Sequence, residues 1–326
     1  MTRKIAVAAV AWLAFSACNN TPNPNPTPSP SQTQTGGTGG PPAVLTYHND
    51  LMRDGQNLDE TILTRNNVNT TDFGKIAALP VDGLVYAQPL YAPGVSVSGT
   101  AHNIVYVETE NDTVYAYDAD TLSTTPIWQR SLVGDSMWTC PNAPCTVPTA
   151  LDSGVPNITP IIGITATPVI DQAHGTLYVT AFTKENGLFY WRLHALNLAT
   201  GAEQAGSPAI INGSVPGSGE GADPSGMIAF NPIRHLSRAG LVLSNGQVLV
   251  AFSSMDDQVP THGWIFAFNA STLTQTAAFV TSAESGEDNI WMSGGGPAVD
   301  AIFLVMGGIP LPCNLCGAGA CSGSAS

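Results

Sequence analysis

The stretch Val114-Tyr115-Ala116-Tyr117-Asp118-Ala119-Asp120-Thr121 decides the fold of this chain, because its pattern recurs twice further along. The counterparts are Leu193-His194-Ala195-Leu196-Asn197-Leu198-Ala199-Thr200-Gly201 and Trp264-Ile265-Phe266-Ala267-Phe268-Asn269-Ala270-Ser271-Thr272. The shared alanine returns after 79 and then 72 residues. Such regularity indicates one structural unit used several times.

The rest of each unit predicts a meander of short antiparallel strands. Opening strands follow Ala87-Gln88-Pro89 and Ala166-Thr167-Pro168, and a fourth unit begins at Gly296-Pro297-Ala298. Between the turns lie short runs rich in Val, Ile, Tyr and Phe, which favour strands. Four such strands per unit predict an all-β protein of β-propeller type, with three complete blades and part of a fourth in an incomplete ring.

Several residues of the repeat have an expected structural role. The Asp or Asn at the end of each unit is expected to accept bonds from backbone N–H groups two residues on. The small alanine is expected to let blades approach closely, and Trp128 to cover the next blade. The long segments Ser131 to Ile158 and Ser207 to Arg238 are expected to project from a face as loops.

Composition supports this fold and argues against nucleic-acid binding. Only 10% of the 326 residues are charged, whereas Gly and Pro number 33 and 25, which suits short strands joined by turns. Almost no helix is expected. The formal net charge of −14 would repel a phosphate backbone.

The first residues predict export. Arg3 and Lys4 precede an apolar core from Ile5 to Phe15, which is about half of what a spanning helix needs. Small residues then lead to Cys18, which resembles a bacterial lipobox and implies cleavage before Cys18 and its lipidation. Phe15 is unusual in that motif, so ordinary signal cleavage stays open. We expect residues 1–17 to be the signal peptide of a protein held in the cell envelope.

A stalk is expected after the leader. Residues 18–42 alternate Pro with Asn, Thr and Ser and then become a Gln/Thr/Gly tract, a composition that favours extended chain and cannot form a core. The domain prediction is therefore stalk at 18–42, propeller repeats at 43–306 and a low-complexity tail at 307–326. That tail shows no strand signal.

The repeat endings resemble the pyrroloquinoline quinone (PQQ) repeat family, whose blades end in a Tyr-Ala-x-Asp-x-x-Thr-Gly type of motif. The segment Arg53-Asp54-Gly55-Gln56-Asn57-Leu58, with Phe73-Gly74 after it, looks like the part that enters the propeller in quinoprotein dehydrogenases. The resemblance covers roughly Tyr47 to Asp300 and implies a quinoprotein-like propeller. These are scaffold motifs, and a fold does not establish quinone binding.

The resemblance also implies site residues that this chain lacks. Enzymes of the family hold PQQ and a calcium ion through Glu, Asn and Asp, beneath an adjacent Cys-Cys disulfide. The place of the first-blade Glu, three residues before Pro89, is taken here by Tyr86, and no two cysteines are adjacent. We therefore expect the fold without the chemistry, no catalytic residue and no firm cofactor; PQQ and calcium belong to the alternative.

Other candidate chemistry lies in loops. Cys140 and Cys145 are expected to form a local disulfide in an exported protein. Cys313-Asn314-Leu315-Cys316, with Cys321 after it, has metal-like spacing but no nearby His.

Two acidic loops, residues 255–262 and 284–291, could converge at one face and ligate calcium or contact a partner. The candidate ligands are Asp256, Asp257, Glu287 and Asp288; the simpler interpretation is solvated turns. His174 before Gly175 is interpreted as a turn residue, and a Ser-His-acid hydrolase would need the fold to assemble it, because no nucleophile elbow is present.

The pattern breaks after Asp300, where Ala301 runs straight into an apolar stretch. We expect a truncated or frame-shifted member of a longer family. The predicted function is a surface-tethered propeller that binds or assembles without catalysis, with the membrane and an unknown protein or carbohydrate as partners. The alternatives are a fragment of a PQQ-dependent quinoprotein dehydrogenase and a structural module of a larger envelope or secreted protein.

Overall fold

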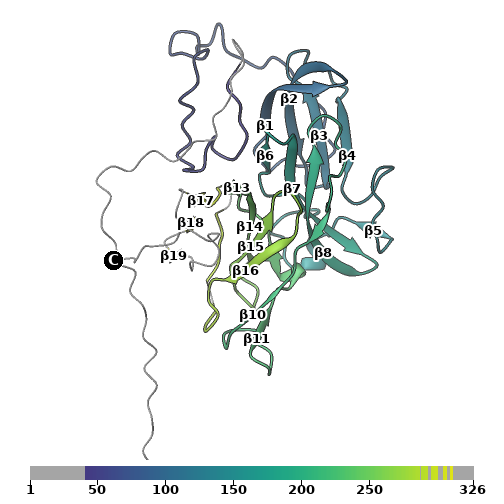
Figure 1. Cartoon of the computed structure of the whole chain (residues 1–326), viewed down its shortest axis with the longest axis vertical. Helices are drawn as coiled ribbons and strands as arrows, with labels where there is room; N and C mark the ends of the chain where they lie inside the picture. The colour runs from purple at the N-terminus through teal and green to yellow at the C-terminus, as the bar shows by residue number, and fades with distance from the viewer. Residues whose placement is uncertain (1–40, 287, 293–294, 300–303, 307–308, 311–326) are drawn as a thin grey trace, which may run out of the picture.

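The computed structural model describes residues 41–310 apart from 287, 293–294, 300–303 and 307–308. The predicted signal peptide, Cys18, most of the stalk and the cysteines of the tail lie outside the described residues. Within them the chain is almost entirely β, and every pairing between its strands is antiparallel (Figure 1).

The first two sheets match the first two repeats. The first has the order β1 to β4, formed by β1 Leu90–Val97, β2 Thr100–Glu108, β3 Thr113–Asp118 and β4 Trp128–Ser131. The second contains β5 Cys145–Thr146, β6 Val169–Asp171, β7 Thr176–Glu185, β8 Leu188–Asn197 and β9 Ala209–Ile210.

The third and fourth sheets follow in the same way. The third contains β12 His235–Leu236, β13 Val242–Ser244, β14 Gln247–Ser254, β15 Trp264–Asn269 and β16 Gln275–Val280. The fourth pairs β17 Ala298–Val299, β18 Leu304–Met306 and β19 Ile309–Pro310. A hairpin of β10 Ser214–Pro216 and β11 Met227–Ala229 projects at the bottom of the view in Figure 1.

The first strand of each sheet lies next to the first strand of the neighbouring sheet, on one side of the molecule. β6 contacts both β1 and β13, and Figure 1 shows β1, β6, β13 and β17 following one another along that side. Successive meanders whose first strands adjoin are the blades of a β-propeller. The fold is therefore all-β and of propeller type, with three complete blades and the start of a fourth among the described residues. These blades do not close a ring.

The turn that ends each repeat forms as predicted. Oδ1 of Asp118 accepts from the backbone N–H groups of the second and third residues after it, and Oδ1 of Asn197 and Asn269 does the same. The next position, Leu122, Gly201 or Leu273, has a positive φ of 51°, 68° or 52°. Each turn therefore reverses the chain within a few residues.

Blade-to-blade contacts also repeat. Tyr106 and Trp128 of the first blade both donate to the Leu198 carbonyl of the second, at 2.9 Å, which confirms that Trp128 covers the next blade. One repeat later, Tyr178 donates to the carbonyl of Ala270 at 2.7 Å. Gly201 must be small, because a Cβ there would lie 2.6 Å from the Trp128 ring. The repeat alanines are fully buried as expected.

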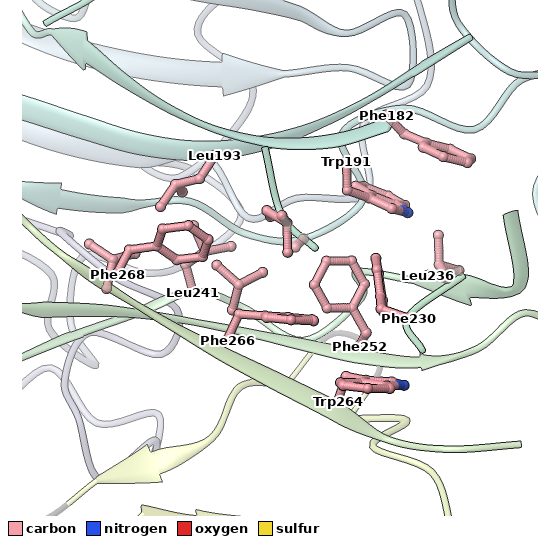
Figure 2. Packing of buried hydrophobic residues seen from close by; sticks show 14 of the residues in the cluster. Phe182, Trp191, Leu193, Phe230, Leu236, Leu241, Phe252, Trp264, Phe266 and Phe268 are labelled. Carbon is pink, nitrogen blue, oxygen red and sulfur yellow. The ribbon is translucent and has the colours of Figure 1, made fainter. Parts of the chain in front are cut away.

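Aromatic packing joins the second and third blades (Figure 2). Trp191 stacks on Phe182 with ring centroids 4.3 Å apart and meets Phe252 edge to face at 5.4 Å. Phe230, from the segment between the blades, packs edge to face against Phe252 and Phe266. The rings are fully or almost fully buried, so this cluster supplies much of the apolar area removed from water here.

The two long segments between repeats differ from the prediction. They project in part, but β5 pairs with the far end of β7, and β12 pairs with the far end of β14. The pairing is available because β7 and β14 extend beyond the short opening strands β6 and β13. The same segments hold the four-residue helix α1 Ala150–Ser153 and the 3-10 turn η1 Pro232–Arg234.

The prediction of a strand-free tail from residue 307 is wrong at Ile309–Pro310. These two residues pair with β18, which itself pairs with β17. A two-residue bridge needs only backbone groups and an open neighbouring edge, so it leaves little trace in side-chain pattern. The described residues include no helix long and apolar enough to span a membrane.

Candidate functional site

The residues that precede the opening strands occupy equivalent positions in successive blades. Ala87, Ala166 and Ala239 are all buried, and the residues just before them are Tyr86, Thr165 and Arg238. Neighbouring openings are bonded to each other: Gln88 N–H donates to Thr167 Oγ1 at 2.9 Å, and Leu241 N–H to the Thr167 carbonyl at 2.8 Å. The blades thus bring Tyr86, Thr165 and Arg238 to one end of the inner strands.

Glu110 joins this group from the β2–β3 turn. Its carboxylate accepts from Gly163 N–H at 2.6 Å and from Thr165 Oγ1 at 2.9 Å. Burial raises the pKa of Glu110 to about 7, although these two bonds and the positive charge of Arg238 act in the opposite direction. Gly163 allows the close approach, because a Cβ there would lie 2.3 Å from the Glu110 carbonyl oxygen.

Arg238 is the cation of the group. Its guanidinium carbon lies 5.5 Å from the centroid of the Trp291 ring, in cation–π range. Burial lowers its pKa, while Glu110, Tyr86 and Asp256 are near enough to act electrostatically in the other direction. We call Tyr86, Glu110, Thr165, Arg238 and Trp291 the axial site.

Arg53 fills the space beside the opening strands. Its guanidinium donates to Thr46 Oγ1 and the Tyr47 carbonyl at 2.6 Å each, to the Leu241 carbonyl at 3.0 Å and to the Pro297 carbonyl at 3.2 Å. Burial lowers its pKa to about 10, so it stays charged at neutral pH. Arg53 therefore ties the segment before the first blade to the third and fourth sheets.

Two further buried carboxyl groups lie near Glu110 in sequence. Both carboxyl oxygens of Glu108 are buried with no hydrogen-bond partner, and burial raises its pKa to about 8. Asp112 accepts weakly from Phe182 N–H at 3.4 Å, and burial raises its pKa as well. Neither joins Glu110 in a three-ligand metal group among the residues the structure describes.

Cys140 and Cys145 form a disulfide, as predicted, next to the β5–β7 pairing. Along the described part of the chain, the cluster with metal-ligand spacing is these two sulfurs with Glu185. Their disulfide bond and the ion pair of Glu185 with Arg192 already occupy those atoms. The cysteines at 313, 316 and 321 fall outside the described residues.

The two acidic loops do converge. His262 forms a bridge with Asp288, and Asn289 accepts from Ser254 N–H at 2.8 Å and donates to Asp257 Oδ1 at 3.4 Å. Among the described residues, Asp256, Asp257 and Asp288 do not form a three-ligand metal group. Glu287 lies outside them, so calcium ligation by these four residues stays a prediction.

The histidines have structural partners. His174 caps the turn before β7 through Asp171, at 2.7 Å from Nδ1 to Oδ2, in agreement with its interpretation as a turn residue. The buried His262 lies 3.0 Å from Ser282 Oγ and 2.6 Å from the Glu220 carbonyl oxygen, which gives each ring nitrogen a partner. No carboxylate of the described chain is hydrogen-bonded to that ring, so a Ser-His-acid triad is not assembled there.

Comparison with known proteins gives structural likeness alone. No protein-family model matches the chain, and no curated protein sequence matches it. One similar solved structure is a quinohemoprotein alcohol dehydrogenase from Pseudomonas putida HK5, with a TM-score of 0.37, 17% identity and a match over 62% of this chain and 21% of that one.

A europium-containing methanol dehydrogenase is also similar, with a TM-score of 0.32 and 15% identity over 59% of this chain and 24% of that one. The chain thus spans about a fifth to a quarter of the length of either enzyme. Similarity at this level concerns the fold, and the blade assignment stands on the strand order and contacts given above.

Proposed function

We propose that this chain is a propeller tethered to the bacterial cell envelope that binds another envelope component at the axial site and does not itself catalyse a reaction. The observation that carries the proposal is the position of Tyr86 and Arg238. Equivalent places in two blades bring them to one end of the inner strands, where Tyr86 is 52% exposed. Binding residues held by rigid strands at a blade end are a common use of such scaffolds.

The tether is proposed from the sequence. Cleavage of the leader before Cys18, lipidation of Cys18 and an extended stalk would anchor the folded part to lipid and hold it away from the membrane surface. The partner would be a protein, a carbohydrate or a smaller component of the envelope. The chain's net charge of −14 disfavours nucleic acid.

The alternative function, a fragment of a quinoprotein dehydrogenase, has less support than a binding role. Calcium takes six to eight oxygen ligands, and the described residues gather no three carboxylates at one point. Tyr86, where the resembled enzymes have Glu, offers a phenol in place of a carboxylate. The donor set of the axial site therefore does not fit the PQQ and calcium pair. No contact among the described residues tests the other alternative, a structural module of a larger envelope or secreted protein.

A photo-crosslinking amino acid placed at Tyr86 in the full chain tests the binding role in the native envelope. The matched control carries it at Leu188, which is 61% exposed at the β7–β8 turn and is not a member of the axial site. We expect a discrete adduct, detected by mass spectrometry, from position 86 and none from position 188. Equal labelling at both positions, or none at either, contradicts the proposal.

A further inference from the structure

The first blade has one face that no other described blade covers. Ala116 of β3 packs with the second blade, so its neighbours Tyr115 and Tyr117 point to the opposite face. The Tyr117 hydroxyl donates to the Pro80 carbonyl, and Asp82 accepts from two threonine hydroxyl groups of the first blade at 2.7 and 2.6 Å. The chain just before β1 therefore covers this free flank in place of a neighbouring blade.

The chain reaches this flank from the other end of the row of blades. The Leu51 carbonyl accepts from the Val299 N–H of β17 at 2.8 Å. Arg53 donates to the Pro297 carbonyl, also in the fourth sheet's opening. Residues 54–79, which we call the entry segment, therefore start beside the fourth sheet and end at the free flank of the first blade. Figure 1 shows the entry segment as the purple loop at the upper left, on the open side of the incomplete ring.

The entry segment is ordered by local turns and exposes its apolar side chains. Its hydrogen bonds join residues at most five positions apart, and none of its residues is buried. Leu58, Ile76 and Phe73 are 85%, 84% and 56% exposed. Exposed apolar side chains collected on one segment are typical of a surface that a partner covers.

The position and charge of the entry segment favour a second copy of the chain as that partner. Propellers contain about four to eight blades, and the described residues form three complete blades and part of a fourth, so two copies supply a ring of that size. A two-fold axis places the open side of each copy against the other. Two basic and four acidic residues give the entry segment a net charge of −2, against −14 for the chain, so repulsion between the acidic copies is weak there.

We propose that the entry segment is a self-association surface through which two copies of this chain form a two-fold dimer, each covering the open side of the other. Leu58, Phe73 and Ile76 of each copy are removed from water at this contact, which drives the association. The surface lies outside the axial site, and the inference does not depend on the binding role proposed above.

Light scattering during size-exclusion chromatography of the purified full chain, with the mass of any detergent subtracted, measures this association. We expect a mass of two chains that falls to one chain on dilution. Ile76→Glu should raise the dissociation constant by about tenfold or more, because it places a charge at an apolar contact. The matched control is Leu151→Glu. Leu151 is 93% exposed on α1, outside the entry segment, and this variant should associate as the wild type does.

A photo-crosslinking amino acid in place of Phe73 gives a second measurement in the native envelope. We expect an adduct of two copies of the chain, identified by mass spectrometry. A mass of one chain at every concentration, a two-chain mass that Ile76→Glu leaves unchanged, or the absence of a two-copy adduct from position 73 overturns the inference. A far-ultraviolet circular dichroism spectrum establishes that Ile76→Glu is folded, and the adduct from position 73 gives the answer if it is not.

The self-association and the binding role fail separately. A monomeric chain with a specific adduct from position 86 to another envelope component refutes the dimer and leaves the binding role standing. A two-chain mass sensitive to Ile76→Glu, without an adduct from position 86, does the reverse.

Discussion

Replacing Glu108 by Gln should change how the stability of the protein depends on pH. Burial raises the pKa of Glu108 from 4.5 to about 8, so the folded protein holds a proton there that the unfolded chain releases at lower pH. Between those two values the folded state binds more protons than the unfolded state, and the free energy of unfolding falls as pH rises. Protonation of Glu108 makes its full contribution to the free energy of unfolding below pH 4.5, and that contribution is lost as the pH rises to about 8.

The size of the effect follows from the shift. Each pH unit inside the window changes the free energy of unfolding by at most about 1.4 kcal/mol for one proton, so the whole window is worth up to roughly 5 kcal/mol. Glu108→Gln removes this proton, while Glu110 and Asp112 remain in both proteins and cancel in the difference. The stability of Glu108→Gln minus that of the wild type should therefore rise steadily from pH 5 to pH 8.

Urea unfolding at half-unit pH steps measures this difference directly. A change in stability from burying the Gln amide does not depend on pH, so it moves the plot of the stability difference against pH up or down without changing its slope. As a control, Glu108→Met should give the same slope as Glu108→Gln. A difference that stays constant from pH 5 to pH 8 would refute the reasoning, because Glu108 would then be ionised at the same pH in the folded and unfolded chains.

Three other outcomes follow from the structure. Gly163→Ala should lower the free energy of unfolding in urea by about 2 kcal/mol or more, because its Cβ would lie 2.3 Å from the Glu110 carbonyl oxygen. The control Gly74→Ala, where no atom lies within 4 Å of the added Cβ, should change that free energy by less than about 0.5 kcal/mol. Similar losses for both variants would contradict the close approach at Gly163. Tyr178→Phe should lower the free energy of unfolding by about 1 kcal/mol, because the Ala270 carbonyl loses the hydrogen bond from Tyr178. Tyr106→Phe should lower it by less, because Trp128 still donates to the Leu198 carbonyl. The opposite order in urea unfolding would contradict these contacts between blades. Cys18→Ser should abolish incorporation of labelled palmitate and move the protein from the membrane to the soluble fraction, and a wild-type chain that takes up no label would contradict lipidation.

The propeller could be predicted from the sequence because its signals are local and repeated. The bonds accepted by Asp118, Asn197 and Asn269 depend on residues two and three positions away, so the pattern is visible without the fold. Trp128 and the buried alanines follow from the same register. The Cys140–Cys145 disulfide also closes over a short span.

The axial site could not be predicted, because its members meet only through blade packing. Glu110 and Arg238 are separated by 128 positions and belong to different repeats, and neither lies in a recognisable motif. The signal that could have found it is a charged residue, Arg238, directly before Ala239, the buried alanine that precedes the opening strand of the third blade, in a chain with few charges. The pairing of β5 with β7 and of β12 with β14 could not be predicted either, because strand edges bond through backbone groups that are common to almost all residue types.

The central claim is that the blades serve binding without quinone catalysis, and reconstitution tests it most directly. The purified chain would be incubated with PQQ and calcium, and alcohol-dependent reduction of an electron-accepting dye would be followed against PQQ and calcium alone. The account predicts the same rate with and without the protein. Dye reduction that requires protein, calcium and alcohol together would contradict it.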